Sequence, residues 1–219
     1  MKKEFSTCPE AIDESRLFGF SWMEFVAGIP SPLVLVTGYK ANGKPNASMQ
    51  SWTSFVGNGG YYCIFGSVNK NTHMYASVKQ TKQLVINFPD KDNFLKCMDT
   101  IKNNDYENDE ITMSGLTAEP ASKVNAPRIR ECFLNLECEY AWEKELFPGS
   151  EHVVMCVKVV NLCMDDAYYH SEKKGRYGET GYLYNIRSLR NPETGETEEA
   201  AVGILQRYAV YDELKAVKD

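Results

Sequence analysis

Apolar and polar residues alternate from Leu134 to Trp142, and this alternation limits the possible folds more strongly than any other pattern in the sequence. Such a pattern predicts an antiparallel strand with one buried face. A turn is expected at Phe147-Pro148-Gly149-Ser150. Val153–Leu162 is apolar at nearly every position except Lys158, so it should return as a strand covered on both faces, by the core and by another element or subunit. The residues expected on the buried face of the first strand are Leu134, Leu136, Cys138, Tyr140 and Trp142.

Four more strands are expected in the first half of the chain. The segments are rich in β-branched, aromatic or alternating residues and are bounded by turn residues. They are Pro32–Tyr39, Lys44–Trp52, Tyr61–Phe65 and Gln83–Phe88. Asn42-Gly43 lies between the first two, and this pair predicts a hairpin turn because both residues tolerate positive φ.

Two helices are expected between these strands. The first begins at Asn71 or Thr72, either of which can cap a helix that runs to about residue 80. The second begins at Asp90 or Asp92 and carries apolar residues at helical spacing. Those residues are Phe94, Leu95, Met98 and Ile101.

About six strands with few helices predict a mainly β fold, a closed antiparallel β-barrel, because closure removes exposed strand edges. We expect the barrel to occupy residues 31–166, after a leader of residues 1–30. Residues 167–219 show little periodicity, so we expect an arm that packs on the barrel or on a dimer partner. Tyr168, Tyr169, Tyr182 and Tyr184 make this arm aromatic, and most of them would pack it onto the barrel.

Composition argues against several classes of protein. The chain of 219 residues has a net charge of −6 and no basic stripe, which argues against a nucleic-acid or membrane-surface partner. No apolar run approaches the ~20 residues that span a bilayer. The start of the chain has basic residues but lacks the apolar stretch of a secretory signal. We therefore expect a cytoplasmic protein.

The seven cysteines are scattered and include no C-x-x-C pair. An odd number in a chain expected to be intracellular argues against a disulfide framework, so we expect core thiols rather than metal ligands. His73 and His170 have no partners at metal-ligand spacing, so no metal site is predicted. The absence of G-x-G-x-x-G excludes a Rossmann dinucleotide domain.

Two polar segments lie where strand pattern gives way to loop, namely Asn46–Ser54 and Ser67–Thr72. Both place small hydroxyl and amide side chains there, and Lys70 adds a cation just before the expected helix start. A helix start offers free N–H groups and a favourable dipole to a phosphate. Together the segments indicate a cradle for a flat, polar-edged, phosphorylated molecule, and flavin mononucleotide (FMN) meets that description.

The order and spacing of these segments resemble the flavin reductase-like family, whose fold is the FMN-binding split barrel of Greek-key type, and its flavoredoxin branch in particular. The resemblance covers roughly residues 32–166 and depends on the ordered set rather than on one motif. It is carried by Pro32–Thr37, Asn42–Asn46, Ser51–Thr53, Lys70–Thr72, Ser114–Thr117, Ala121–Val124, Glu131 and His152. It implies a homodimer with FMN near the subunit interface, used for electron or hydride transfer.

The resemblance also implies roles for single residues. The edge of the flavin ring would be held by Asn46 and by the backbone of the segment from Ser51 to Ser54. The residues of that segment are Ser51, Trp52, Thr53 and Ser54. The phosphate would be held by Ser67, Lys70, Asn71 and Thr72. The simpler alternatives are a core tryptophan at Trp52 and an ordinary helix cap at Thr72.

Two further residues are candidates on the same ground. Lys123 would place a cation near the ring, where it would stabilise anionic reduced flavin. His152 is the candidate catalytic residue, because it would contact the ring or a nicotinamide and could move protons near neutral pH. The alternatives are a surface lysine and an exposed histidine without a role.

Three functions stay open. The chain would be a reductase that transfers electrons or hydride from NAD(P)H through FMN to a flavin or other acceptor, an FMN electron carrier that docks on a redox protein and lacks an NAD(P)H site, or a non-catalytic flavin-binding module. Ser67–Lys70 also fits the S-x-x-K pair of serine acylases. Ser171–Lys174 fits it too, and the accompanying S-D-N and K-T-G motifs are absent, which argues against that chemistry.

Overall fold

The computed structural model describes residues 2, 4, 28–169, 175–190 and 197–206. By their contacts, the residues fall into two compact units. Of the described residues, the larger unit contains those within 32–183 together with 204–206. The smaller unit contains 2, 4, 28–31, 184–190 and 197–203.

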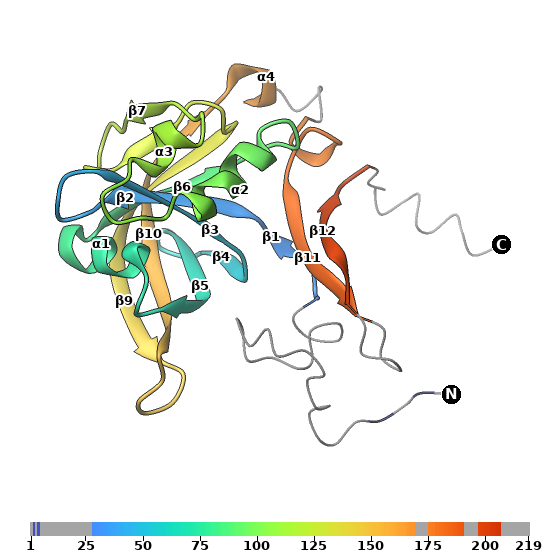
Figure 1. Ribbon diagram of the computed structural model, residues 1–219, viewed down its shortest axis with the longest axis horizontal. Helices are drawn as coiled ribbons and strands as arrows, with labels where there is room; N and C mark the ends of the chain where they lie inside the picture. Colours follow the sequence, from blue (N-terminus) through green and yellow to red (C-terminus); the bar gives the residue numbers. More distant parts are fainter. Residues whose placement is uncertain (1, 3, 5–27, 170–174, 191–196, 207–219) are drawn as a thin grey trace. The chain divides into compact units, whose positions relative to one another are not determined.

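One seven-stranded sheet forms the frame of the larger unit, and its neighbouring strands are antiparallel (Figure 1). The strand order is β3–β2–β6–β9–β10–β5–β4, which contains crossovers and is not a simple meander. The bounds are β2 (Val34–Tyr39), β3 (Pro45–Gln50), β4 (Thr53–Gly57), β5 (Tyr61–Asn69), β6 (Gln83–Phe88), β9 (Leu134–Glu145) and β10 (His152–Met164).

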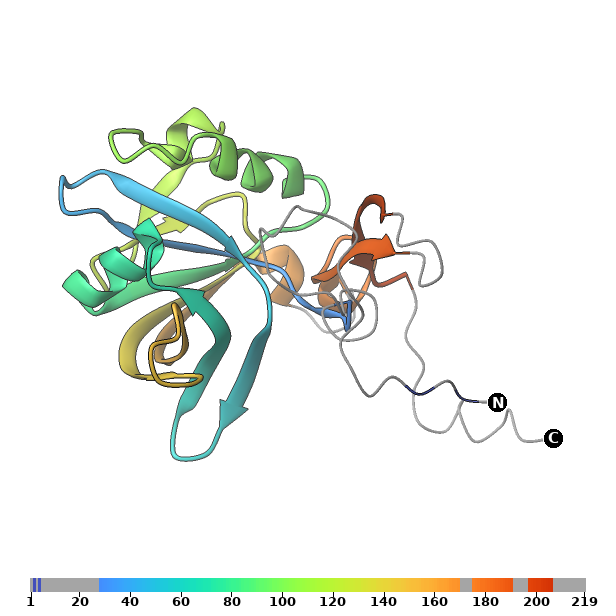
Figure 2. The ribbon, with the colours of Figure 1, turned by 60° about the horizontal axis from the view of Figure 1, so that its bottom comes forward.

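The two edge strands of this sheet, β3 and β4, follow each other in the chain and are joined only by Ser51 and Trp52. Three residue steps span at most about 11 Å, so the two edges must approach each other. The sheet therefore curls back on itself, and Figure 2 shows its strands wrapping round an interior. This is the mainly β barrel with few helices that the sequence predicts.

Apolar side chains from β2, β5, β6, β9 and β10 fill the barrel interior. The largest fully buried ones include Phe65, Leu84, Ile86 and Met155. Helix α1 (His73–Thr81) contributes Met74 and Val78 to the same cluster. Burial of such side chains stabilises the fold by about 1.5–3 kcal/mol each.

A second layer covers the outer face of the barrel beside β2 and β3. It consists of α2 (Phe94–Lys102), α3 (Glu110–Met113) and a short hairpin of β7 (Ala118–Pro120) and β8 (Pro127–Ile129). Its core contains Leu35 and Ala47 from the sheet, packed with Cys97, Ile111 and Ile129.

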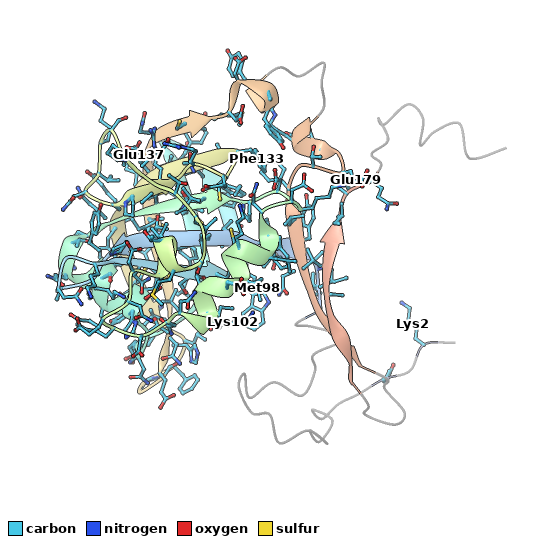
Figure 3. All side chains as sticks on the ribbon, turned by 45° about the horizontal axis from the view of Figure 1, so that its top comes forward. Lys2, Met98, Lys102, Phe133, Glu137 and Glu179 are labelled. Atoms are coloured by element: carbon cyan, nitrogen blue, oxygen red, sulfur yellow. The ribbon has the colours of Figure 1, made fainter. Side chains whose placement is uncertain are left out.

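Aromatic rings fasten the segment after β10 to the barrel. Phe133, labelled in Figure 3, stacks on Tyr168 of α4 (Asp166–Tyr169) with ring centroids 4.5 Å apart. Tyr182 packs edge-on against Phe133 at 5.3 Å, and it follows the short helix η4 (Gly175–Tyr177). Tyr168 and Tyr182 thus pack against the core of the barrel, whereas Tyr169 is 69% exposed.

The smaller unit contains strands that the sequence did not predict. β1 (Ser31–Pro32), β11 (Leu183–Arg190) and β12 (Thr197–Ile204) form a three-stranded sheet in the order β1–β11–β12. The weak periodicity of this region concealed two strands of ordinary length.

Four expectations about the larger unit are wrong in detail. The strand expected to reach Trp52 ends at Gln50, because Trp52 has a φ of 56°, and β4 then begins as an unpredicted strand. In β9, Glu137 is fully buried although it lies on the polar face, and Trp142 is 47% exposed although it lies on the apolar face. The expected division into one buried and one exposed face therefore does not hold along the whole strand.

The two other departures concern β10 and α2. β10 is covered on both faces only in its first half, since Leu162 is 55% exposed. In α2 the buried residues are Cys97 and Thr100, whereas Leu95 and Ile101 are exposed. The buried face of this helix is therefore rotated from the one that its apolar residues predict.

Candidate functional site

Most of the predicted site residues gather where β5 ends and α1 begins. Ser67 lies near the end of β5, Lys70 and Asn71 follow it, and Thr72 is the N-cap of α1. Trp52 joins them through its carbonyl oxygen, which accepts a 2.9 Å hydrogen bond from the N–H of Gly66. The strand β5 thus connects the two polar segments that the sequence singled out.

The cap of α1 is fully formed. Thr72 has extended backbone angles, and its Oγ1 accepts a hydrogen bond from the N–H of Tyr75 at 3.2 Å. The same hydroxyl donates to the carbonyl oxygen of Asn69 at 2.8 Å. The N–H groups of His73 and Met74 lie in the first turn and have no intrahelical acceptor. Together with the helix dipole they make this end of α1 attractive to an anion.

Lys70 is not a free cation. Its Nζ lies 2.8 Å from Glu145 Oε1, at the end of β9, and this hydrogen bond lowers the pKa of Glu145. Its backbone N–H donates to the carbonyl oxygen of Glu151 at 2.9 Å. The N–H of Asn71 is also taken, by Asn69 Oδ1 at 2.8 Å. Nothing in the sequence marked Glu145 as the partner of Lys70, because it is one of several glutamates at the end of an alternating strand.

The backbone reverses sharply at Trp52. A φ of 56° is unusual for a residue with a side chain, and it places the Trp52 carbonyl against β5. A Cβ atom on Gly66 would lie 3.1 Å from that oxygen, so the close approach requires glycine there. After the reversal Thr53 is buried, whereas Ser54 and the rest of β4 are exposed.

Two predicted residues carry buried oxygens without hydrogen-bond partners. Asn46 is 2% exposed and Thr53 is 9% exposed. Among the residues that the structure describes, neither Asn46 Oδ1 nor Thr53 Oγ1 has a hydrogen-bond partner. A buried polar group left in this state costs about 1–3 kcal/mol. The two oxygens are therefore suited to a ligand that offers hydrogen-bonding groups.

A buried ion pair, which sequence reasoning missed, links the Asn46 segment to the start of α1. Glu110 is fully buried, and its Oε1 accepts a 2.9 Å hydrogen bond from Lys40 Nζ. Its Oε2 accepts the N–H of Ala47 at 2.8 Å, and His73 Nδ1 lies 3.8 Å from Oε1. Glu110 follows the acidic residues Asp105, Glu107 and Asp109 in the chain, so no sequence signal marked it as buried.

His152 lies beside this group of residues. It is half-buried at the start of β10 and faces Asn69 across the strand pair. Val153 and Met155 point into the core, so His152 and Val154 point outward. The predicted histidine is therefore near the cap of α1, on the outer side of the sheet.

Lys123 lies apart from the other candidates. The loop that carries it is anchored on Glu137, labelled in Figure 3, which accepts the N–H of Ser122 at 3.0 Å and that of Lys123 at 2.6 Å. Asn161 donates to the same carboxylate at 2.9 Å. Burial opposes ionisation of Glu137, but these donors outweigh it and hold the pKa below its ordinary value. Within residues 28–169 no hydrogen bond or ion pair joins the Lys123 side chain to the Thr72 region.

Other sites find no support in the described part of the chain. No group of three His, Cys, Asp or Glu side chains there could hold a metal ion. No helix there is long and apolar enough to cross a membrane. Cys63, Cys97, Cys132, Cys138 and Cys156 are buried free thiols, as expected, and burial raises the pKa of Cys63 to about 12. Cys8 and His170 lie outside the described residues.

The sequence matches a known family over most of its length. The family described as "Flavin reductase like domain" matches residues 26–186. A protein of Methanothermobacter thermautotrophicus described only as uncharacterized is 29% identical over 114 residues, which cover 50% of this chain. The match covers 51% of that protein, so the chain spans about half the length of the curated relative it matches.

Several solved structures have a similar fold. One is described as a putative flavin reductase with a split barrel domain from Shewanella frigidimarina, with a TM-score of 0.70 at 15% identity over 86% of this chain and 88% of that one. Flavoredoxin of Desulfovibrio vulgaris gives 0.62 at 17% identity over 97% and 100%. The NADH:FAD oxidoreductase of Streptomyces globisporus gives 0.60 at 14% over 80% and 92%. At these identities the likeness concerns the fold alone.

Proposed function

Because the chain belongs to the flavin reductase-like domain family, we propose that it is an FMN-dependent oxidoreductase that passes electrons or hydride from NAD(P)H to a flavin or another acceptor. The observation that carries the proposal is the pairing of two features along β5. Thr53, whose buried oxygen has no partner among the described residues, pairs with Phe65 of β5, and the capped start of α1 beside Lys70 follows the end of that strand. Asn46, the second residue with such an oxygen, lies in β3 opposite Gly38. A polar ring edge and a phosphate lie at the two ends of FMN, joined by the hydroxylated ribityl chain.

The residues present fit this cofactor. An isoalloxazine ring offers one N–H and several acceptor atoms at its edge, which the Asn46 oxygen and the Thr53 hydroxyl can pair with. The backbone of Ser51–Ser54 follows the reversal at Trp52 and would run along the same edge. The phosphate would take the first-turn N–H groups of α1, the Thr72 hydroxyl and the Lys70 ammonium. Ser67 and Asn71 flank this position.

When bound, FMN would accept a hydride from NAD(P)H and release electrons to an acceptor. The protein would supply binding and orientation. The Glu110 carboxylate holds the Ala47 N–H and lies close to His73, so it keeps the ring-binding and phosphate-binding segments at a fixed separation. His152 would contact the ring or the nicotinamide from the outer side of the sheet.

We also propose that the protein is a homodimer with the cofactor near the interface. A row of cross-strand neighbours, Ser54, Ile64, Cys156 and Trp142, runs across the outer face of β4, β5, β10 and β9. The row begins at Ser54, a candidate cofactor-binding residue, and ends at Trp142, which is 47% exposed. Lys123 also lies on an outer surface, so its side chain would contact a cofactor only across the proposed dimer interface.

An FMN electron carrier is the second candidate, and the fold that the chain shares with a flavoredoxin over 97% of its length favours it. Such a carrier would dock on a redox protein and lack a nicotinamide site. The two functions predict different electron donors.

One anaerobic experiment separates them. The protein, loaded with FMN, is mixed with NADH or NADPH while the absorbance near 450 nm is followed. Rapid bleaching is expected for the reductase. Failure to bleach, followed by reduction with a ferredoxin-type donor, would establish the carrier instead. A protein that binds no FMN would contradict both and leave only the fold.

A further inference from the structure

The cation of the proposed phosphate site already has an anionic partner. Lys70 Nζ lies 2.8 Å from Glu145 Oε1, with the two side chains 30% and 44% exposed. The second oxygen of Glu145 accepts the N–H of Gly149 at 3.1 Å. Glu145 is the last residue of β9, and its carboxylate therefore holds Lys70 toward the β9–β10 turn. A negative charge at this place also repels a phosphate dianion that approaches the same lysine.

We propose that Glu145 competes with the cofactor phosphate for Lys70 and thereby lowers the affinity of the site for FMN relative to riboflavin. The inference rests on the proposed function, because Glu145 is not one of the proposed FMN-binding residues but would adjust the affinity of that same site. Its consequence is a cofactor site that holds FMN less tightly than it would without Glu145.

The exchange of partners by Lys70 needs little rearrangement. The backbone N–H of Lys70 is fixed to Glu151, so only the flexible four-carbon side chain has to turn. Glu145 keeps the Gly149 N–H and its contact with water when Lys70 leaves. No buried charge is left behind, so the competition is worth no more than an exposed ion pair.

The remaining groups of the cradle are bonded within the chain in the same way. The Thr72 hydroxyl donates to the Asn69 carbonyl oxygen, and Asn69 Oδ1 accepts the Asn71 N–H. A phosphate must replace these bonds, whereas the first-turn N–H groups of α1 are open to it. Glu145 differs from them because it can be neutralised without altering the helix cap.

The test is the binding of FMN and of riboflavin to the wild type and to Glu145→Gln, followed by flavin fluorescence quenching. The variant should bind FMN about two- to fivefold more tightly and leave riboflavin unchanged, since only FMN carries a phosphate. In a Lys70→Ala background the substitution should have a smaller effect on FMN, limited to the direct repulsion between the Glu145 carboxylate and the phosphate.

Glu179→Gln is the matched control. Glu179 also forms an exposed pair, with Lys91 at 2.6 Å, so its substitution changes the net charge equally without freeing Lys70. It should leave both affinities unchanged. Equal affinity of Glu145→Gln and wild type for FMN, or equal tightening of riboflavin, would overturn the role of Glu145 while leaving FMN binding intact. Failure of the wild type to bind either flavin would overturn the proposed function itself.

Discussion

At the scale of single residues, the site depends on side chains whose hydrogen bonds are already satisfied within the chain and on a few that are not. Thr72 belongs to the first kind, with both an acceptor and a donor bond in place. Asn46 Oδ1 and Thr53 Oγ1 belong to the second. A satisfied cap keeps α1 folded without a ligand, while the buried oxygens favour the ligand-bound state.

Replacing Thr72 by Val tests the phosphate position. The variant loses the hydroxyl, so FMN should bind about tenfold more weakly while riboflavin binding changes little. The lost cap should also reduce the free energy of unfolding by about 0.5–2 kcal/mol. Thr72→Ser keeps the hydroxyl and should restore most of both quantities. Titration with the two flavins measures the effect, and an equal loss for both would place the phosphate elsewhere.

Glu110→Ala tests the buried ion pair. The substitution leaves the Lys40 ammonium buried with only the carbonyl oxygens of Asp105 and Asn108, so it should lower the free energy of unfolding by about 3–5 kcal/mol. Asp99→Asn breaks the exposed pair with Lys102 and should cost less than about 1 kcal/mol. Urea unfolding at pH 7 compares the variants. Similar losses for the two would show that Glu110 does not stabilise the segment as its burial indicates.

At the scale of elements, the sequence predicted the strands and helices whose patterning is set by the barrel interior. β2, β6 and α1 follow their expected positions closely, because β2 and β6 are apolar runs buried on both faces and α1 begins at a local cap signal. The errors occur where cover from a distant segment changes the exposure of single residues. Glu137 reads as solvent-facing in an alternating strand, yet it is buried because the loop at Ser122 and Lys123 closes over it. Such long-range cover leaves no local trace.

The candidate site divides in the same way. The Thr72 region was predictable because a helix cap is a local signal, and the structure gathers these residues at one place. The reversal at Trp52, the buried Glu110 and the partner of Lys70 were not predictable, since each depends on a residue distant in the chain. The separation of Lys123 from the residues near Thr72 was unpredictable for the same reason, because the Lys123 loop is anchored on Glu137, which is distant in the chain.

The anchored loop should make the stability of the fold depend on acid pH. The pKa of Glu137 is lowered in the folded protein from an ordinary value of 4.5, so its contribution is present above that value and is lost as the pH falls through the lower folded pKa. Glu137→Gln should be less stable than the wild type at pH 7 by about 2 kcal/mol, and the difference should shrink between pH 5 and pH 3. Urea unfolding across this range measures it. A difference that stays constant with pH would mean that Glu137 is not the ionised anchor.

At the scale of the whole molecule, the outer face of β4, β5, β10 and β9 is apolar where the barrel meets solvent. Val56 and Trp142 are each 47% exposed, and Ile64 and Cys156 lie in the row between Ser54 and Trp142. A stable interface buries about 800 Å² on each partner, and tryptophan contributes more than its share. The expected second subunit would therefore cover this face, and His152 would come to lie at its margin.

Replacement of Trp142 by Glu should weaken the dimer by at least about tenfold, because a charge would be buried where an aromatic ring packs. Sedimentation velocity over a range of protein concentrations gives the dissociation constant. Leu95→Glu is the control, since Leu95 is 73% exposed on α2, away from this face, and should leave the association unchanged. If the cofactor lies near the interface, the Trp142 variant should also bind FMN more weakly at concentrations where it is a monomer. A wild-type monomer that binds FMN with full affinity would show that one barrel completes the site alone.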